Sequence, residues 1–141
     1  GAGGLHARAA WAQSQRFEAI DPSACATWLE RNSEPGDEVF LHDYGAFPRL
    51  FYRNRHNVYT LGLDPGFMRA KDPALLRRYL AAVRLERDPY PFIAGTLGAR
   101  YVYVENTRLS RPFHDYLLAH RAQFRPVYRD DFAAVFAVVP R

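Results

Sequence analysis

Residues 38–61 read EVFLHDYGAFPRLFYRNRHNVYTL, and this stretch decides the expected fold. Its first five residues, Glu38–His42, form a short, largely apolar and β-prone run, which is typical of a buried strand. A short aromatic helix is expected over Phe47–Tyr52, and a second strand over Val58–Leu61. A strand, a helix and a strand in this order indicate a βαβ unit whose two strands run parallel.

Outside this stretch, Asp-Pro pairs mark candidate helix starts, because Asp caps free backbone N–H groups and proline is tolerated at the first helical position. The pair Asp72-Pro73 opens the clearest helix of the chain. Its apolar residues lie on one side, and Arg77, Arg78 and Arg84 face away from them.

Further helices and strands alternate along the chain. One helix is expected to follow Asp21-Pro22 and end at Asn32, a second to cover Phe92–Leu97, and a third to begin at the cap Ser110 and end at Ala119. Strands are expected over Arg100–Glu105, Phe124–Arg129 and Ala133–Val139. The sequence therefore predicts an α/β fold with three layers and a mainly parallel sheet of about five strands. A C-terminal antiparallel hairpin is expected at the edge of that sheet.

The chain has 141 residues, which is the length of one domain. Residues 1–4 are interpreted as a non-native remnant or a flexible lead-in, and residues 5–141 as a single α/β domain. The longest apolar run, Phe132–Val139, is far shorter than the roughly 20 residues that a membrane span needs. The single cysteine, Cys25, excludes a disulfide framework within the chain.

Positive charge is the main compositional bias. The chain carries a net charge of +4, and every basic residue except Lys71 is an arginine. Arginine suits a phosphate-binding surface, because its guanidinium group makes bidentate contacts with phosphate. A GC-rich genome would produce the same bias, and we favour that interpretation.

Arginines also interleave with aromatic residues. Arg49, Arg53 and Arg55 alternate with Phe47 and Phe51, a pattern found in proteins that bind single-stranded nucleic acid. The two phenylalanines lie at helical spacing, which favours core packing instead. The arginines could alternatively meet lipid head groups or a phosphate-linked substrate. We expect no nucleic-acid partner.

Polar side chains follow three of the expected strands at their carboxyl ends, where ligands usually bind in open α/β sheets. The candidates are His42, Asp43 and Tyr44 after the first strand, Asp64 after the second, and Glu105 and Asn106 after the third. Converging histidine and carboxylate groups would form a metal site or an acid–base pair, with His42, Asp43, Asp64 and Glu105 as candidate catalytic residues. The alternative, which we favour, is that Asp43 and Asp64 cap the helices that follow.

Motifs for covalent and nucleotide chemistry are absent from the sequence. It contains no Gly-x-Ser-x-Gly, no Gly-x-Gly-x-x-Gly and no Gly-Lys-Ser/Thr ending of a phosphate loop. Cys25 falls inside an amphipathic helix and is interpreted as a core residue. We therefore expect neither a cofactor nor a resident metal.

Several segments carry a family pattern: residues 28–29 (WL), 35–40 (PGDEVF), 43–52 (DYGAFPRLFY), 59–68 (YTLGLDPGFM), 101–104 (YVYV) and 127–130 (VYRD). Across residues 26–138 the chain resembles the soluble C-terminal domain of bacterial polytopic membrane proteins of the glycosyltransferase type. These are related to the dolichyl-phosphate-mannose-type and lipid A aminoarabinose transferases.

The resemblance implies an integral membrane protein with this domain on the extracytoplasmic, periplasmic face of the bacterial inner membrane. In such enzymes sugar passes from a polyprenyl-phosphate donor to an acceptor, and the catalytic carboxylate lies in the first loop of the membrane part. For this chain the resemblance implies a non-catalytic role, in supporting the membrane domain or placing the acceptor. The implied partners are the upstream transmembrane domain and a polyprenyl-phosphate-linked sugar or the acceptor. Candidate ligand-binding residues are Tyr44, Arg49, Arg53 and Asp64.

Two other functions stay open. One is a stand-alone enzyme or metal-binding domain that uses the carboxylates at the strand ends. The other is an arginine-driven binding module for anionic lipid or nucleic acid, whose affinity would fall steeply with salt.

Overall fold

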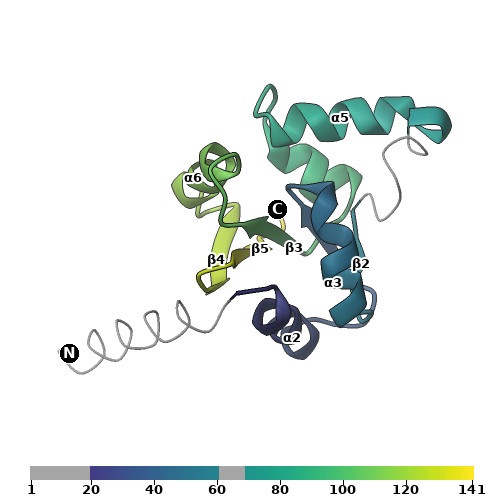
Figure 1. The fold of residues 1–141 in the computed structure, drawn as a ribbon. Coiled ribbons are helices and arrows are strands. Elements are labelled where there is room, and N and C mark those ends of the chain that lie inside the picture. The colour runs from purple at the N-terminus through teal and green to yellow at the C-terminus, as the bar shows by residue number, and fades with distance from the viewer. Residues whose placement is uncertain (1–19, 61–68) are drawn as a thin grey trace.

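The computed structural model describes residues 20–60 and 69–141, which form a five-stranded sheet with helices around it (Figure 1). In chain order the elements are α2 (Ser23–Asn32), β1 (Glu38–Leu41), η1 (Tyr44–Ala46), α3 (Phe47–Arg53), β2 (Val58–Tyr59), α5 (Pro73–Val83), η2 (Pro91–Thr96), β3 (Tyr101–Glu105), α6 (Arg111–Ala119), β4 (Phe124–Arg129) and β5 (Ala133–Val138). These bounds agree closely with the predicted ones. The predicted end of the second strand, at Leu61, lies outside the described residues.

The sheet is mixed, with the strand order β2-β1-β3-β5-β4. Strand β1 runs parallel to β2 and β3, whereas β5 runs antiparallel to β3 and β4. Helices with a five-stranded sheet and a C-terminal hairpin agree with the prediction. A mainly parallel sheet and a three-layer arrangement are not confirmed.

The hairpin forms one end of the sheet, as predicted. Its second strand, β5, lies between β3 and β4, so that of the two hairpin strands β4 lies at the edge. Strand β5 reads AAVFAV and is buried along nearly its whole length. Apolar side chains on both faces of a strand are hidden from water only in the interior of a covered sheet, which explains its position.

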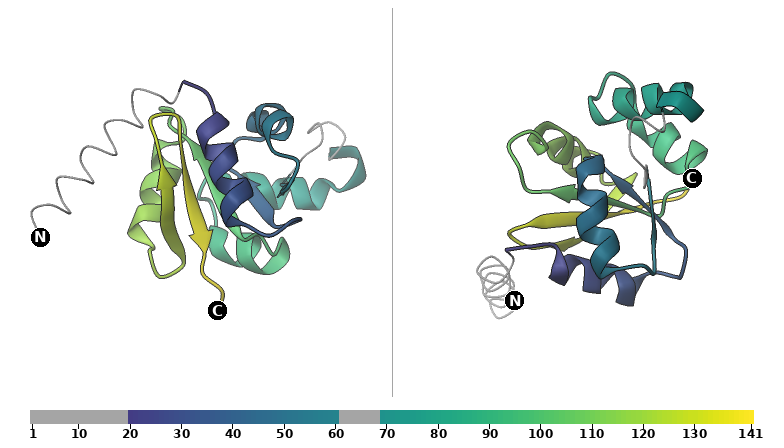
Figure 2. Two further views of the ribbon diagram at one scale, coloured as in Figure 1. Left: turned by 90° about the horizontal axis from the view of Figure 1, so that it is seen from below. Right: turned by 45° about the vertical axis from the view of Figure 1, so that its right-hand side comes forward.

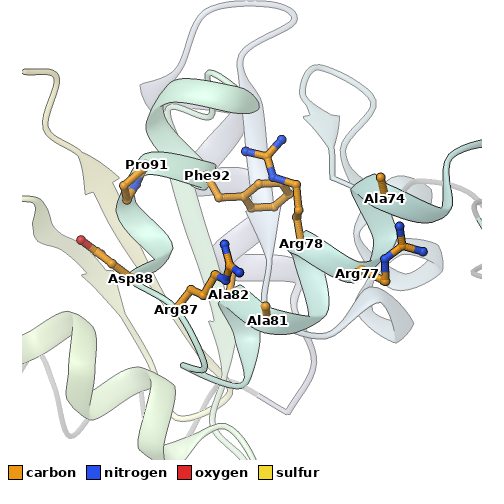
Figure 3. Close-up of a pocket in the computed structure, with 9 residues that line it drawn as sticks. All are labelled: Ala74, Arg77, Arg78, Ala81, Ala82, Arg87, Asp88, Pro91 and Phe92. Atoms are coloured by element: carbon orange, nitrogen blue, oxygen red, sulfur yellow. The ribbon is translucent and has the colours of Figure 1, made fainter.

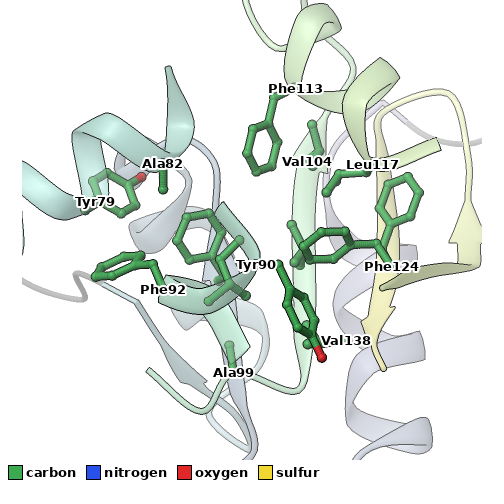
Figure 4. Close-up of a cluster of buried hydrophobic side chains, with 14 of the residues drawn as sticks. Tyr79, Ala82, Tyr90, Phe92, Ala99, Val104, Phe113, Leu117, Phe124 and Val138 are labelled. Atoms are coloured by element: carbon green, nitrogen blue, oxygen red, sulfur yellow. The ribbon is translucent and has the colours of Figure 1, made fainter. Parts of the chain in front are cut away.

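Alternate residues of the central strands point to opposite faces and enter two buried clusters. On one face, Val104 and Val138 pack with side chains from α5, η2 and α6 (Figure 4). On the other face, Leu41 and Val135 pack with side chains from α2 and α3. Each cluster therefore joins side chains of the sheet to a different set of helices (Figure 2).

Phe40 of β1 joins three helical elements on the first face. Its fully buried ring lies 5.4 Å from Tyr79 of α5, 6.5 Å from Phe92 of η2 and 6.2 Å from Phe113 of α6, measured between ring centroids. Aromatic pairs at this spacing add to the stabilisation from burial. One strand residue thus positions the helices of this face relative to each other.

Helix starts follow the prediction at one site and depart from it at another. The carboxylate of Asp72 accepts a hydrogen bond from the backbone N–H of Leu75 at 3.0 Å, so the predicted cap of α5 is confirmed. Ser110 does not cap α6, and that prediction is wrong. Its hydroxyl lies 2.5 Å from the carbonyl oxygen of Glu105 and 3.0 Å from that of Thr107, because it closes the loop between β3 and α6 instead.

A reversal of the chain direction follows α5. Leu85 has a φ of 58°, in the left-handed region, and its backbone N–H donates to the carbonyl oxygen of Ala82 at 3.1 Å. The next element, η2, is a six-residue π-helical turn that ends before Gly98, whose φ of +66° suits glycine. This reversal places η2 beside α5.

Tyr79 connects α5 to the end of β1. Its buried hydroxyl donates to the carbonyl oxygen of Leu41 at 2.6 Å and lies 3.0 Å from that of His42. The bond fixes the first turn of backbone after the strand, where the candidate site begins.

We expect Tyr79→Phe to lower the free energy of unfolding by about 2 kcal/mol, because buried carbonyl oxygens lose their donor without a change of shape. Chemical denaturation measures the difference. Tyr116→Phe removes a more exposed hydroxyl, which lies 3.3 Å from Asp88, and should cost less than about 0.5 kcal/mol. Equal losses in the two variants would contradict the assigned role of Tyr79.

Candidate functional site

The ends of β1 and β3 bring part of the predicted site together. These strands are parallel neighbours, and the backbone N–H of His42 donates to the carbonyl oxygen of Tyr103 at 3.3 Å. His42 and Asp43 therefore leave the sheet at the same edge as Glu105. Asp64, the fourth candidate catalytic residue, lies outside the described residues.

Glu105 is held by bonds at both carboxylate oxygens. Oε1 lies 2.6 Å from a guanidinium nitrogen of Arg49, and Oε2 accepts a hydrogen bond from the Tyr103 hydroxyl at 2.8 Å. The Glu105 side chain is 10% exposed and that of Arg49 is 45% exposed. Burial is the main reason that the pKa of Tyr103 lies far above its usual range. The three side chains fasten α3 to the end of β3.

Asp43 performs the capping role that the sequence analysis favoured. Its carboxylate accepts a hydrogen bond from the backbone N–H of Gly45 at 2.8 Å and so closes the start of η1. A Cβ atom at position 45 would lie 3.1 Å from the same carboxylate oxygen, so a larger residue there would crowd the cap. Asp43 is exposed, and its bond lies within its own loop.

His42 packs against the core and not toward a carboxylate cluster. Its half-buried ring lies 4.8 Å from that of Phe113 of α6. Burial lowers the pKa of His42 below 6.5, and the nearby charge of Asp43 opposes this shift. A hydrogen bond with the backbone of Val83 also opposes this pKa shift, so the ring contacts both α6 and the end of α5.

Of the four predicted ligand-binding residues, the described part of the chain contains an exposed tyrosine and two arginines that are bonded to other elements. Tyr44 is exposed at the start of η1. Arg53 donates to the hydroxyl of Ser23 at 2.9 Å and lies 3.6 Å from a carboxylate oxygen of Asp21. Arg53 thus joins α3 to α2, and Arg49 joins α3 to β3.

The aromatic residues of α3 are only partly core residues. Phe47 packs against Tyr59 at 6.0 Å and stacks on Phe51 at 5.2 Å, as core packing predicts. Phe51 is exposed beneath the Arg55 guanidinium, which lies 5.0 Å from the ring centre, and Tyr52 is 79% exposed. The expectation of core packing is therefore confirmed for Phe47 and wrong for Phe51.

Acidic and histidine side chains do not assemble into a metal site in the described part of the chain. Across residues 20–60 and 69–141, no group of three or more His, Cys, Asp or Glu side chains could hold a metal ion. None of the helices within these ranges is both long enough and apolar enough to cross a membrane.

Hollows lined by described residues also occur elsewhere on the surface. One, of about 590 Å³, lies between α2 and β4 beside Trp28 and Tyr128. Another, of about 620 Å³, lies between α5 and η2 and is lined by Arg77, Arg78 and Arg87 (Figure 3). The apolar periodicity of α5 puts Arg77 and Arg78 on its outer side. It gives no sign that η2 packs against that side, so the hollow between α5 and η2 could not be predicted from the sequence.

We expect a double-mutant cycle on Arg49→Gln and Glu105→Gln to give a coupling energy of about 1 kcal/mol, because one partner is mostly buried. The pair Arg84 and Glu86 is the matched control, since its atoms are 4.0 Å apart and both side chains are exposed. Its coupling should be below about 0.3 kcal/mol. Equal couplings for the two pairs would show that the link from α3 to β3 is not structural.

Stability should fall in mild acid because of His42. The unfolded chain takes up a proton near pH 6.5, whereas folded His42 takes it up only at lower pH, so protonation favours unfolding below pH 6.5. His42→Gln should reduce the loss of stability between pH 6.5 and about pH 5, measured by denaturation at each pH.

His114 provides a second test of this pH dependence. Burial also lowers its pKa, so His114→Gln should remove a further part of the acid sensitivity, and the double variant should have the flattest profile. An unchanged profile in His42→Gln would contradict the burial assigned to that ring.

Comparisons of the chain with family models, with curated proteins and with solved structures found no match. The resemblance to membrane glycosyltransferase-like proteins is therefore a prediction from the sequence.

Proposed function

We propose that this chain is a non-catalytic extracytoplasmic domain of a membrane-embedded glycosyltransferase-like protein. Its role is to support the membrane domain or to help place the acceptor. Its partners are the upstream transmembrane part of the same parent chain and a polyprenyl-phosphate-linked sugar or the acceptor. The domain lies on the periplasmic face of the bacterial inner membrane.

The observation that carries the non-catalytic role is the bonding of the strand-end residues. Glu105 uses both carboxylate oxygens to hold Arg49 and Tyr103, and Asp43 is bonded to its own loop. The ring of His42 packs at a tilt against that of Phe113. A general acid or base needs a free atom within hydrogen-bond reach of a substrate, whereas both carboxylate oxygens of Glu105 and one of Asp43 are already bonded within the fold. This favours a supporting role over a stand-alone enzyme.

Exposed apolar and aromatic residues support contact with a membrane domain or a membrane surface. Tyr44, Phe51, Tyr52 and Val58 are large exposed residues within one short stretch of chain. The Arg53 guanidinium lies 5.9 Å from the Tyr52 ring centre and that of Arg55 lies 5.0 Å from the Phe51 ring centre, so each of these rings has a cation beside it. Aromatic rings with cationic side chains suit the region where a protein meets a membrane surface or a membrane domain.

The location of the native chain tests this proposal. In the bacterium that encodes it, an antibody against residues 69–141 should detect a membrane-bound chain that is much larger than 16.2 kDa. Protease added to spheroplasts should remove the epitope, because the domain faces outward. A cytoplasmic protein probed on the same blot should survive, which controls for cell lysis.

A chain of about the same size as this one, recovered without membranes and protected in spheroplasts, would overturn the proposal. The strand-end residues would then need to be tested as an active site in their own right.

A further inference from the structure

The groove between α5 and η2 gathers positive charge in a concave place. Arg77 and Arg78 come from α5, and Arg87 comes from the turn that follows Leu85 (Figure 3). The volume of the groove, about 620 Å³, is in the range of small-ligand sites. The lining contains three guanidinium groups and a single carboxylate, that of Asp88.

Arg78 is held in position by two contacts with η2. Its guanidinium carbon lies 5.1 Å from the centre of the Phe92 ring, and one of its nitrogens donates to the Thr96 hydroxyl at 2.7 Å. The π-helical turn places both partners on the side of η2 that faces α5. A guanidinium fixed in this way loses less freedom when it binds a ligand.

Arg77 and Arg87 are not ion-paired within the described residues, unlike three other arginines of the chain. Arg49, Arg53 and Arg84 each form an ion pair with a carboxylate. Within residues 20–60 and 69–141, neither Arg77 nor Arg87 has an ion pair or a side-chain hydrogen bond. Their charges are therefore available to an anion from outside.

Asp88 is bonded on the opposite side, toward α6. Its Oδ1 accepts from the backbone N–H of Tyr90 at 3.1 Å and lies 3.3 Å from the Tyr116 hydroxyl. In Figure 3 its carboxylate points away from Arg78 and Arg87. It therefore does not neutralise the centre of the groove.

The remaining lining is apolar. Ala81, Ala82, Pro91 and the Phe92 ring form a surface between the cations. A ligand that combines an anionic group with a hydrocarbon or ring portion would satisfy both parts of this lining.

We propose that this groove is a binding site for a phosphate or diphosphate group attached to an apolar or ring-shaped portion. Several guanidinium groups suit phosphate, because its oxygens accept paired N–H donors and carry more than one negative charge. The group can belong to a free organic phosphate or to a lipid head. This proposal does not depend on the proposed function, because it concerns only residues of this groove.

Two probes distinguish these sources. Binding of inorganic pyrophosphate to the full chain is measured by calorimetry at low ionic strength. Binding to phosphatidylglycerol vesicles is measured by sedimentation, with phosphatidylcholine vesicles as the neutral reference. Saturable binding of pyrophosphate supports a free phosphate ligand, and binding of phosphatidylglycerol vesicles alone supports a lipid head group.

The double variant Arg77→Gln/Arg87→Gln should weaken the binding at least about tenfold. Both side chains are exposed, so the fold should be retained. The control, Arg111→Gln/Arg121→Gln, removes the same charge from exposed positions on and after α6. It should change the affinity by less than about twofold.

Arg78→Lys tests whether geometry matters as well as charge. Lysine keeps the charge but cannot stack as a planar group on Phe92 or donate in pairs, so affinity should fall about threefold or more. Full affinity in Arg78→Lys would show that binding depends on positive charge alone and would overturn the proposal. Absence of binding to both probes, or equal losses in the two double variants, would overturn it too.

Discussion

The parallel pairing of β1 with β3 is the constraint on which the rest of this structure depends. It buries Phe40 against one set of helices and Leu41 against the other, so a single four-residue strand sets the position of both helical faces. Strand β3 pairs with β5 on its other side, and its middle residues are buried on both faces. Loss of this central register would expose apolar side chains on both sides at once.

Polar groups at the sheet edge serve the fold. In an open sheet the loops after parallel strands are the usual place for a ligand, and here they carry the expected His42, Asp43 and Glu105. Each is nonetheless bonded to a neighbouring element or to its own loop. A carboxylate that is 10% exposed needs a cation beside it, and Arg49 provides one. These contacts tie the end of the sheet to α3, η1 and α6.

Charge is more available away from that edge. The chain turns sharply at Leu85 and forms a π-helical turn, and both departures from regular helix place η2 beside the outer side of α5. Such departures are uncommon and are often associated with function. Their effect here is to hold Arg78 on Phe92 while Arg77 and Arg87 stay unpaired within the described part of the chain. Helix α3, by contrast, carries exposed rings with guanidinium groups beside them.

Local patterns in the sequence were sufficient for the elements, because periodicity, Asp-Pro starts and the cap at Asp72 depend on neighbouring residues. The roles of particular residues depended on distant partners. Ser110 bonds to Glu105 and not to the helix that follows it, and β5 enters the sheet because its two apolar faces need cover. Arg49 meets a residue 56 positions away. The groove likewise exists only where a helix and a π-helical turn face each other, since burial and charge pairing are set by the tertiary contacts of each side chain.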